Sequence, residues 1–70
     1  MVEYTINITW DHDAAVWCAV CEDIPIALES GSFDKLIERV KSAAPELLEM
    51  NGADPICILC FVAECKDKVA

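Results

Sequence analysis

The sequence is poor in basic residues and in glycine, and it contains no long apolar run. Five Lys and Arg stand against 13 Asp and Glu, which gives a net charge of −8. Phosphate backbones and anionic lipid surfaces both require clustered Lys and Arg, so neither a nucleic acid nor a membrane is expected as a partner. With two glycines, the chain also lacks a Gly-rich loop of the kind that cradles phosphates.

Export and membrane signals are missing as well. Met1-Val2-Glu3 has no basic start, and no continuous apolar stretch follows it. The longest uncharged apolar run, residues 55–63, is far too short to span a bilayer. Five cysteines, an odd number, in a chain without an export signal are typical of reduced thiols. We therefore expect a cytoplasmic protein.

What the sequence does contain is enough apolar material for a core. Its 70 residues are near the lower limit for an unaided domain, but 56% of them are hydrophobic. A chain of this kind buries a core and leaves further apolar surface exposed. The acidic charge complements a basic protein partner, because opposite charges steer encounter; it would also serve solubility alone. We expect one domain over residues 1–70.

Alternation of apolar and polar residues predicts strands in the first part of the chain. Residues 2–10 alternate with the period of a strand that has one buried and one wet face. A polar break at residues 11–14 predicts a hairpin turn, and residues 16–21 fit an antiparallel return strand. Pro25 ends that strand because it cannot donate to a central ladder, and residues 26–29 fit a short third strand.

A long amphipathic helix follows. Ser32 is a good N-cap, and apolar residues recur at helical spacing from Phe33 to Leu48. Pro45 removes one backbone donor, so we expect a kink near residues 41–45. Asn51-Gly52 supplies a C-terminal cap, and residues 56–65 fit a last strand. The predicted fold is α+β, in the order β-β-β-α-β, with an antiparallel-rich sheet and one long helix on one face.

The last strand is apolar on both faces. One face carries Ile56, Ile58, Cys60 and Val62, and the other carries Cys57, Leu59, Phe61 and Ala63. One helix covers only one face of a sheet, and a strand of this kind is buried on both sides or meets a partner. We therefore expect a homo-oligomer that assembles through this strand, with Leu59, Phe61 and Ala63 as contact residues.

Two C-x-x-C pairs, Cys18/Cys21 and Cys57/Cys60, raise the alternative of a metal or redox protein. Four thiolates can hold a tetrahedral zinc ion. Residues i and i+3 of a strand point to opposite faces, however, and neither pair lies in a tight turn or at a helix N-terminus. We interpret these cysteines as small buried hydrophobic residues and expect no metal and no cofactor.

No arrangement of catalytic residues is evident, so we do not expect an enzyme. His12 stands alone between Asp11 and Asp13 and is interpreted as a solvated turn residue. The sequence contains no paired Cys-His arrangement and no activated Ser. Trp10 and Trp17 are interpreted as core or interface aromatics, because base stacking would need a basic groove beside them.

Five short motifs occur in an order that is typical of one family. They are the strand at residues 4–8, Trp17, the turn at 23–25, the helix start at 30–34 and the helix residues 36–44. In these segments the chain resembles the HicB-like antitoxin superfamily, and it is similar to short single-domain members of unknown function. The resemblance implies a truncated ribonuclease H fold. Ribonuclease H activity is not expected, because Thr5, Asn7 and Thr9 stand where the first strand would need metal-binding carboxylates.

The resemblance also implies a function. Typical family antitoxins bind and block a small basic toxin that cleaves messenger RNA, which implies a non-enzymatic protein-binding module here. The predicted partner-binding residues are Trp17, Glu22, Asp23 and Glu29. Many members carry a C-terminal DNA-binding segment, whereas this sequence ends directly after its last strand, so DNA binding by this chain is not expected. A domain that only associates with itself is the alternative.

Overall fold

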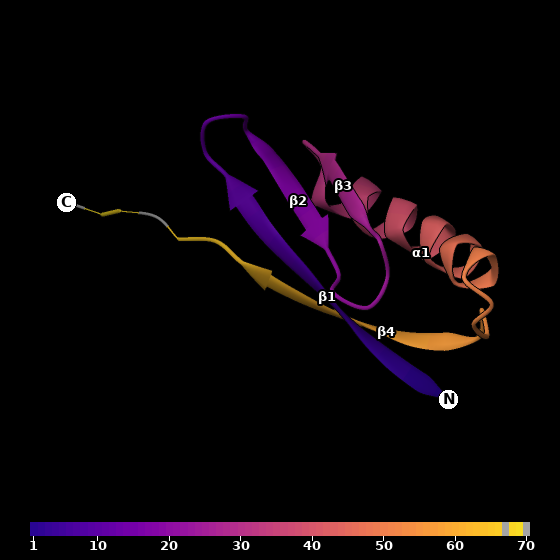
Figure 1. Cartoon of the computed structure of the whole chain (residues 1–70). Helices are drawn as coiled ribbons and strands as arrows, with labels where there is room; N and C mark the ends of the chain where they lie inside the picture. The colour runs from indigo at the N-terminus through magenta and orange to yellow at the C-terminus, as the bar shows by residue number, and fades with distance from the viewer. Residues whose placement is uncertain (67, 70) are drawn as a thin grey trace.

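The computed structural model describes residues 1–66 and 68–69 of the chain. The elements follow in the order β1 (Val2–Asp11), β2 (Val16–Val20), β3 (Ala27–Ser30), α1 (Phe33–Met50) and β4 (Cys57–Glu64) (Figure 1). The predicted α+β class and the β-β-β-α-β order are confirmed. The third strand begins one residue later than predicted, and the last strand is one residue shorter at each end.

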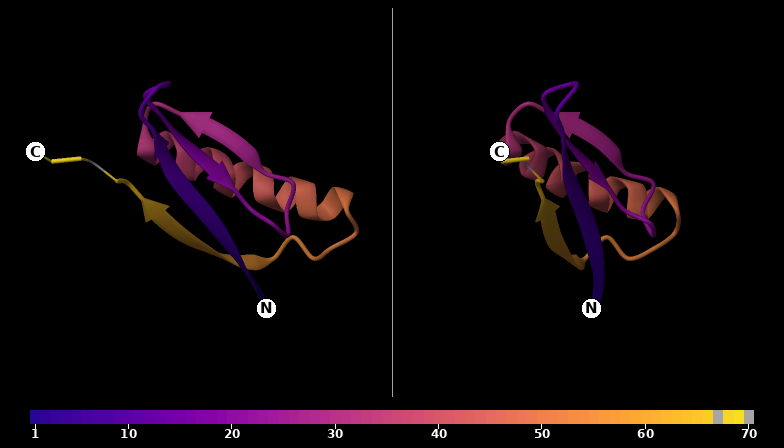
Figure 2. Two further views of the ribbon diagram at one scale, coloured as in Figure 1. Left: turned by 60° about the vertical axis from the view of Figure 1, so that its left-hand side comes forward. Right: turned by 90° about the vertical axis from the view of Figure 1, so that its left-hand side faces the viewer.

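The four strands form one mixed sheet in the order β3-β2-β1-β4. β1 pairs antiparallel with β2, and β2 pairs antiparallel with β3. After α1, the chain returns so that β4 pairs parallel with β1 along its whole length. α1 lies on one side of this sheet (Figure 2). The two edges of the sheet are therefore the four-residue β3 and the eight-residue β4.

The core lies between α1 and the strands. Ile6 and Ile8 of β1 and Ala19 of β2 are fully buried, and so is the stripe of α1 that packs against them. That stripe recurs every four residues and consists of Leu36, Val40, Ala44 and Leu48. The predicted division of the first strand into a buried and a wet face is confirmed.

Both ends of α1 are capped as predicted. The Ser32 hydroxyl accepts a hydrogen bond from the Lys35 backbone N–H at 3.4 Å. At the other end, the Asn51 N–H donates to the carbonyls of Leu47 and Leu48, both at 3.2 Å. Gly52 follows with φ of 74°, in the left-handed region that glycine adopts without strain. The helix runs on through Pro45, and the kink expected there stays a prediction.

The β1–β2 hairpin contains one strained residue. Ala15 has φ of 54°, the left-handed region, which costs an L-residue about 1–2 kcal/mol. The turn before it is held by the Asp11 carboxylate, which accepts hydrogen bonds from the N–H groups of Asp13 (3.0 Å) and Ala14 (3.3 Å). These hydrogen bonds hold the turn that leads into Ala15, and the turn keeps this residue in its strained conformation.

We expect Ala15→Gly to raise the free energy of unfolding by about 0.5 kcal/mol. Glycine removes the left-handed strain, and part of this gain is offset by the greater freedom of glycine in the unfolded chain. Chemical denaturation of the variant beside Ala14→Gly, which gains no such relief, measures the difference. Equal stability of the two variants would contradict the assignment of strain to Ala15.

Candidate functional site

The sheet has a helix face and an outer face. The buried Ile6 and Ile8 point to α1, so the alternate residues of β1 point away from it. Asn7 is paired with Val20 on one side and Val62 on the other. The outer face therefore carries a polar column on β1 between apolar columns on β2 and β4. Of its side chains, Val20, Ile58 and Val62 are each 48% exposed.

The predicted self-association residues lie on the other side of β4. Leu59 and Phe61 are half-buried on the helix face, where they pack against the core, and Ala63 is exposed. They are paired in register with Tyr4, Ile6 and Ile8 of β1. α1 leaves them partly uncovered, since a groove of about 300 Å³ separates β4 from the helix. Both faces of β4 thus present apolar surface.

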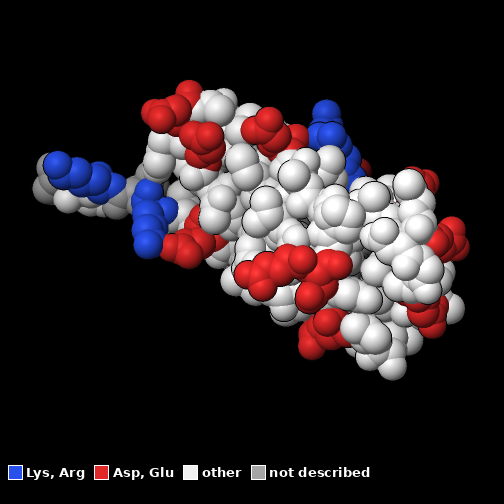
Figure 3. Space-filling model, viewed as in Figure 1, with Lys and Arg blue, Asp and Glu red and all other residues white. Residues whose placement is uncertain are grey.

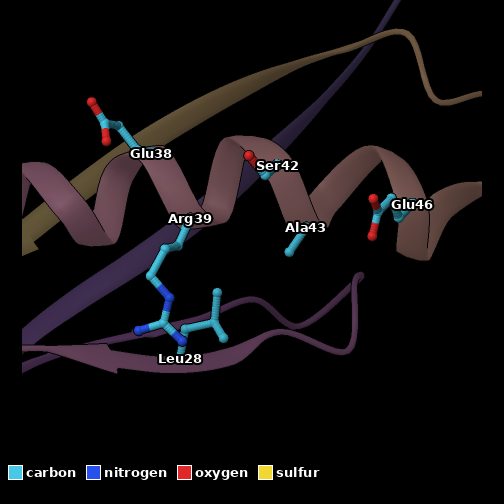
Figure 4. Close-up of a pocket in the computed structure, with 6 residues that line it drawn as sticks. All are labelled: Leu28, Glu38, Arg39, Ser42, Ala43 and Glu46. Carbon is cyan, nitrogen blue, oxygen red and sulfur yellow. The ribbon is translucent and has the colours of Figure 1, made fainter.

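A second groove, of about 470 Å³, lies between β3 and α1. Its lining consists of Leu28, Glu38, Arg39, Ser42, Ala43 and Glu46. Figure 4 shows Arg39 extending from the helix towards the strand that carries Leu28, with Glu38 and Glu46 towards the two ends of the groove. The Arg39 guanidinium donates to the Glu29 backbone carbonyl at 2.7 Å. Arg39 therefore ties α1 to β3 and occupies an acceptor on the sheet edge.

Acidic side chains lie on both sides of β3. Glu29 points to the outer face, opposite Cys18 in the register, while Glu38 and Glu46 lie on the groove side. Glu22 and Asp23 are exposed in the segment that leads into β3. We call these five residues, Glu22, Asp23, Glu29, Glu38 and Glu46, the β3 acidic surface. Figure 3 shows red acidic side chains spread over the body, and blue basic ones on the C-terminal segment and at one place at the upper right of the body.

The structure thus gathers three of the four predicted partner-binding residues around one strand. Trp17 lies on the neighbouring β2, paired with Ser30, but its half-buried side chain is on the helix face. Its ring centroid is 5.1 Å from that of Trp10 and 5.1 Å from that of Phe33. Glu38 and Glu46 are not among the partner-binding residues predicted from the sequence. Their signal was present, because they fall on the polar side of the amphipathic helix, but only the packing of α1 beside β3 joins them to Glu29.

The C-x-x-C pairs are divided by the sheet, as the strand geometry predicts. Cys21 and Cys57 pack against the core, whereas Cys18 lies opposite Glu29 on the outer face. The prediction that the cysteines are buried is wrong, since four of them are half-buried and Cys65 is exposed. They are less buried than predicted because β4 is an edge strand and the outer face of the sheet is uncovered. Within residues 1–66 and 68–69, no three His, Cys, Asp or Glu side chains are grouped so as to hold a metal ion.

Cys18 is in an environment that favours the thiol over the thiolate. Burial, the Glu29 and Asp11 carboxylates, and the hydrogen bond that its Sγ–H donates to Glu29 (3.9 Å) all raise the pKa of Cys18. The thiolate is the nucleophile and the metal ligand, so a raised pKa makes Cys18 less reactive.

We expect Glu29→Gln to increase the alkylation rate of Cys18 near pH 8. The substitution removes a negative charge that raises the thiol pKa, so more thiolate is present at a given pH. Peptide mass spectrometry after timed iodoacetamide treatment measures the rate, with the exposed Cys65 as an internal reference. If the alkylation rate of Cys18 relative to that of Cys65 does not change, Glu29 does not raise the pKa of this thiol.

The prediction that His12 is a solvated turn residue is confirmed, but the residue also makes contacts that the sequence did not indicate. It is exposed, but Trp10 Nε1–H donates to its Nδ1 at 3.2 Å, and its Nε2 lies 2.9 Å from the Lys66 carbonyl oxygen. With Nδ1 accepting, Nε2 carries the proton and donates to Lys66. His12 therefore joins the β1–β2 hairpin to the segment that follows β4, 54 residues further along the chain.

These features define a small α+β domain, a four-stranded mixed sheet with one helix, that presents acidic and apolar surface. None of the helices within residues 1–66 and 68–69 has the length and hydropathy of a membrane crossing. Residues 3–69 match the model of a family described as a domain of unknown function, DUF1902. The chain belongs to that family.

One solved structure is similar over nearly the whole chain. It is the crystal structure of the hypothetical protein TTHA1013 from the extremely thermophilic bacterium Thermus thermophilus, with 28% sequence identity and a TM-score of 0.73. The match covers 97% of each chain. Among curated proteins, none matches.

Proposed function

We propose that this chain is a non-enzymatic protein-binding module of antitoxin type, which neutralises a small basic ribonuclease toxin by covering its surface. The observation that supports the proposal best is the β3 acidic surface. Glu29 lies on one side of β3 and Glu38 and Glu46 lie on the other, with Leu28 between them at the floor of the groove. A basic partner would meet carboxylates on both sides of an apolar strip.

The energetics fit a surface that combines charge with apolar contact. A single exposed ion pair contributes about 0–1 kcal/mol, so carboxylates alone do not hold a partner. Apolar area is available next to them, since Leu28 is half-buried and Val20 is 48% exposed. The net charge of −8 would then act on the rate of encounter and on partner choice.

The resemblance to HicB-like antitoxins supports the class of partner. The strand–turn–helix motifs that carry it fall on β1, β2 and α1, in the confirmed β-β-β-α-β order. Toxins of such pairs are small and basic, which complements an acidic chain. The proposal includes a cytoplasmic location, where messenger RNA is translated and where thiols stay reduced.

Affinity capture tests the proposal. The tagged full-length chain is used to retain binding proteins from a lysate of its own cells, and the retained proteins are identified by mass spectrometry. We expect a small, strongly basic protein in stoichiometric amount, released by raised salt because part of the attraction is screened. Recovery of the chain alone, or of partners without basic character, would contradict the proposed function.

A further inference from the structure

The two edges of the sheet differ in how they are protected. β3 is short, and Arg39 occupies its Glu29 carbonyl. β4 is twice as long, pairs with β1 in an unbroken register, and has no charged residue from Cys57 to Ala63. Proteins usually protect a free edge with charge, proline, a bulge or a short strand. From Cys57 to Ala63, β4 has none of these and is open to another strand.

We propose that β4 pairs antiparallel with β4 of a second copy of this chain, about a two-fold axis at Cys60. The two sheets then form one continuous sheet of order β3-β2-β1-β4-β4-β1-β2-β3. In this register every uncharged residue of β4 faces an apolar residue of the second copy. The opposing pairs are Cys57 with Ala63, Ile58 with Val62, Leu59 with Phe61, and Cys60 with itself.

Charge complementarity supports this occupant and this register. Two of the five basic residues, Lys66 and Lys68, follow β4 in the sequence, on either side of Asp67. Asp54 lies six residues before the axis and Lys66 six residues after it, so Lys66 comes near the bend at residues 54–56 of the second copy. The Asp54 carboxylate is fixed in position, because it accepts a hydrogen bond from the Ile56 N–H at 2.9 Å.

The region around Asp54 contains acidic residues with no basic residue among them in the last turn of α1. The last turn of α1 contains Glu49 and no basic residue, although cations are favoured at a helix C-terminus. Lys66 of each copy therefore comes near Asp54 of the other, at both ends of the paired strands. This offsets part of the repulsion between two chains that each carry a net charge of −8.

Neighbouring registers are worse. With the axis at Leu59, Glu64 would come near Asp54 of the second copy, so like charges would meet. With the axis at Phe61, Glu64 would face Ile58 and Lys66 would face Ile56, so two charges would oppose apolar residues. In the Cys60 register Glu64 faces Ile56, which precedes β4 and is 66% exposed, and Glu64 keeps its ion pair with Lys66 at 3.0 Å.

The pairing also accounts for the groove between α1 and β4. A two-fold axis perpendicular to the sheet places both helices on the same face. Leu59 of each copy then lies beside Phe61 of the other, where α1 leaves these half-buried side chains uncovered. Both β3 acidic surfaces remain free at the outer ends of the joined sheet, so this inference does not rest on the proposed function.

Single-cysteine variants of the full-length chain test the register. Only Cys60 meets itself, with Cα atoms about 4.5–5.5 Å apart, within reach of a disulfide. In the same register, the two copies of Cys57 are about 20 Å apart and those of Cys65 about 34 Å. Three variants each retain one of these cysteines and carry Ser at the other four positions. Diamide takes up the two electrons and two protons that the thiols lose.

We expect the Cys60 variant to form a covalent dimer in high yield and the other two to remain mostly monomeric on a non-reducing gel. Circular dichroism confirms that each variant is folded. Equal cross-linking of all three variants, or faster cross-linking through Cys65, would overturn the register.

A second experiment keeps the cysteines. In sedimentation velocity at about 50 µM, we expect the wild-type chain to have the mass of two copies and Val62→Lys that of one, because Lys then opposes Ile58. Val20→Lys is the matched control: Val20 is also 48% exposed on the outer face, but on β2, and its variant should remain a dimer. A monomeric wild type, or a dimeric Val62→Lys, would overturn the proposal.

Discussion

Replacing Ile8 with Ala is expected to lower the free energy of unfolding by about 2–5 kcal/mol. Ile8 is fully buried on the helix face of β1, in the core that α1 covers. A chain of 70 residues has about 4–10 kcal/mol of stability in total, at about 0.05–0.15 kcal/mol per residue. One substitution thus removes a large share of the stability, because a small core has few side chains to share the loss.

Ile56→Ala is the matched control, since it removes the same atoms from a side chain that is 66% exposed. Its stability should lie within about 0.5 kcal/mol of wild type. Urea denaturation followed by tryptophan fluorescence measures both variants, because Trp10 and Trp17 pack together near the Phe33 end of α1. If the two substitutions cost the same, the core is not where the structure places it.

Reversing three charges of the β3 acidic surface is expected to weaken binding of the basic partner by about 100-fold or more. The variant combines Glu29→Lys, Glu38→Lys and Glu46→Lys. Each reversal removes an attraction and adds a repulsion, and the two effects together weaken binding by about 1 kcal/mol. About 1.4 kcal/mol corresponds to a factor of ten in the dissociation constant. These side chains are exposed, so the fold should be retained. Calorimetric titration with the captured partner measures the dissociation constant.

A control with the same net charge separates a local surface from the overall field. Glu3→Lys, Asp13→Lys and Glu49→Lys together change the charge equally but lie outside the β3 acidic surface. The affinity of this variant for the partner should fall by about tenfold or less, mainly through slower association at low salt. Equal losses in the two variants would show that the partner responds to net charge alone, and the assignment of the site to β3 would then be wrong.

The architecture was largely predictable because its signals are local. Alternation along β1, the Ser32 cap and the Asn51-Gly52 end each depend on residues close together in the chain. The apolar character of both faces of β4 was also readable, since it needs only the period of a strand. These signals determine which elements form and which side of each is buried.

Arrangement between elements was less predictable because it depends on contacts between distant residues. No local pattern indicates that β4 pairs parallel with β1, or that Glu38 lies across a groove from Leu28. The hydrogen bond between His12 and the Lys66 carbonyl spans 54 residues. The position of Trp17 in the alternating pattern of its strand would be the same if its side chain faced a partner. In the structure it packs between Trp10 and Phe33.

The most direct test of the central claim is an RNA cleavage assay of the captured basic protein, with this chain added in increasing amounts. We predict that the basic protein cleaves RNA when alone, that cleavage falls to background at about one equivalent of the chain, and that the chain alone cleaves nothing. Cleavage that continues in the presence of excess chain, or cleavage by the chain itself, would contradict a module that acts by covering its partner.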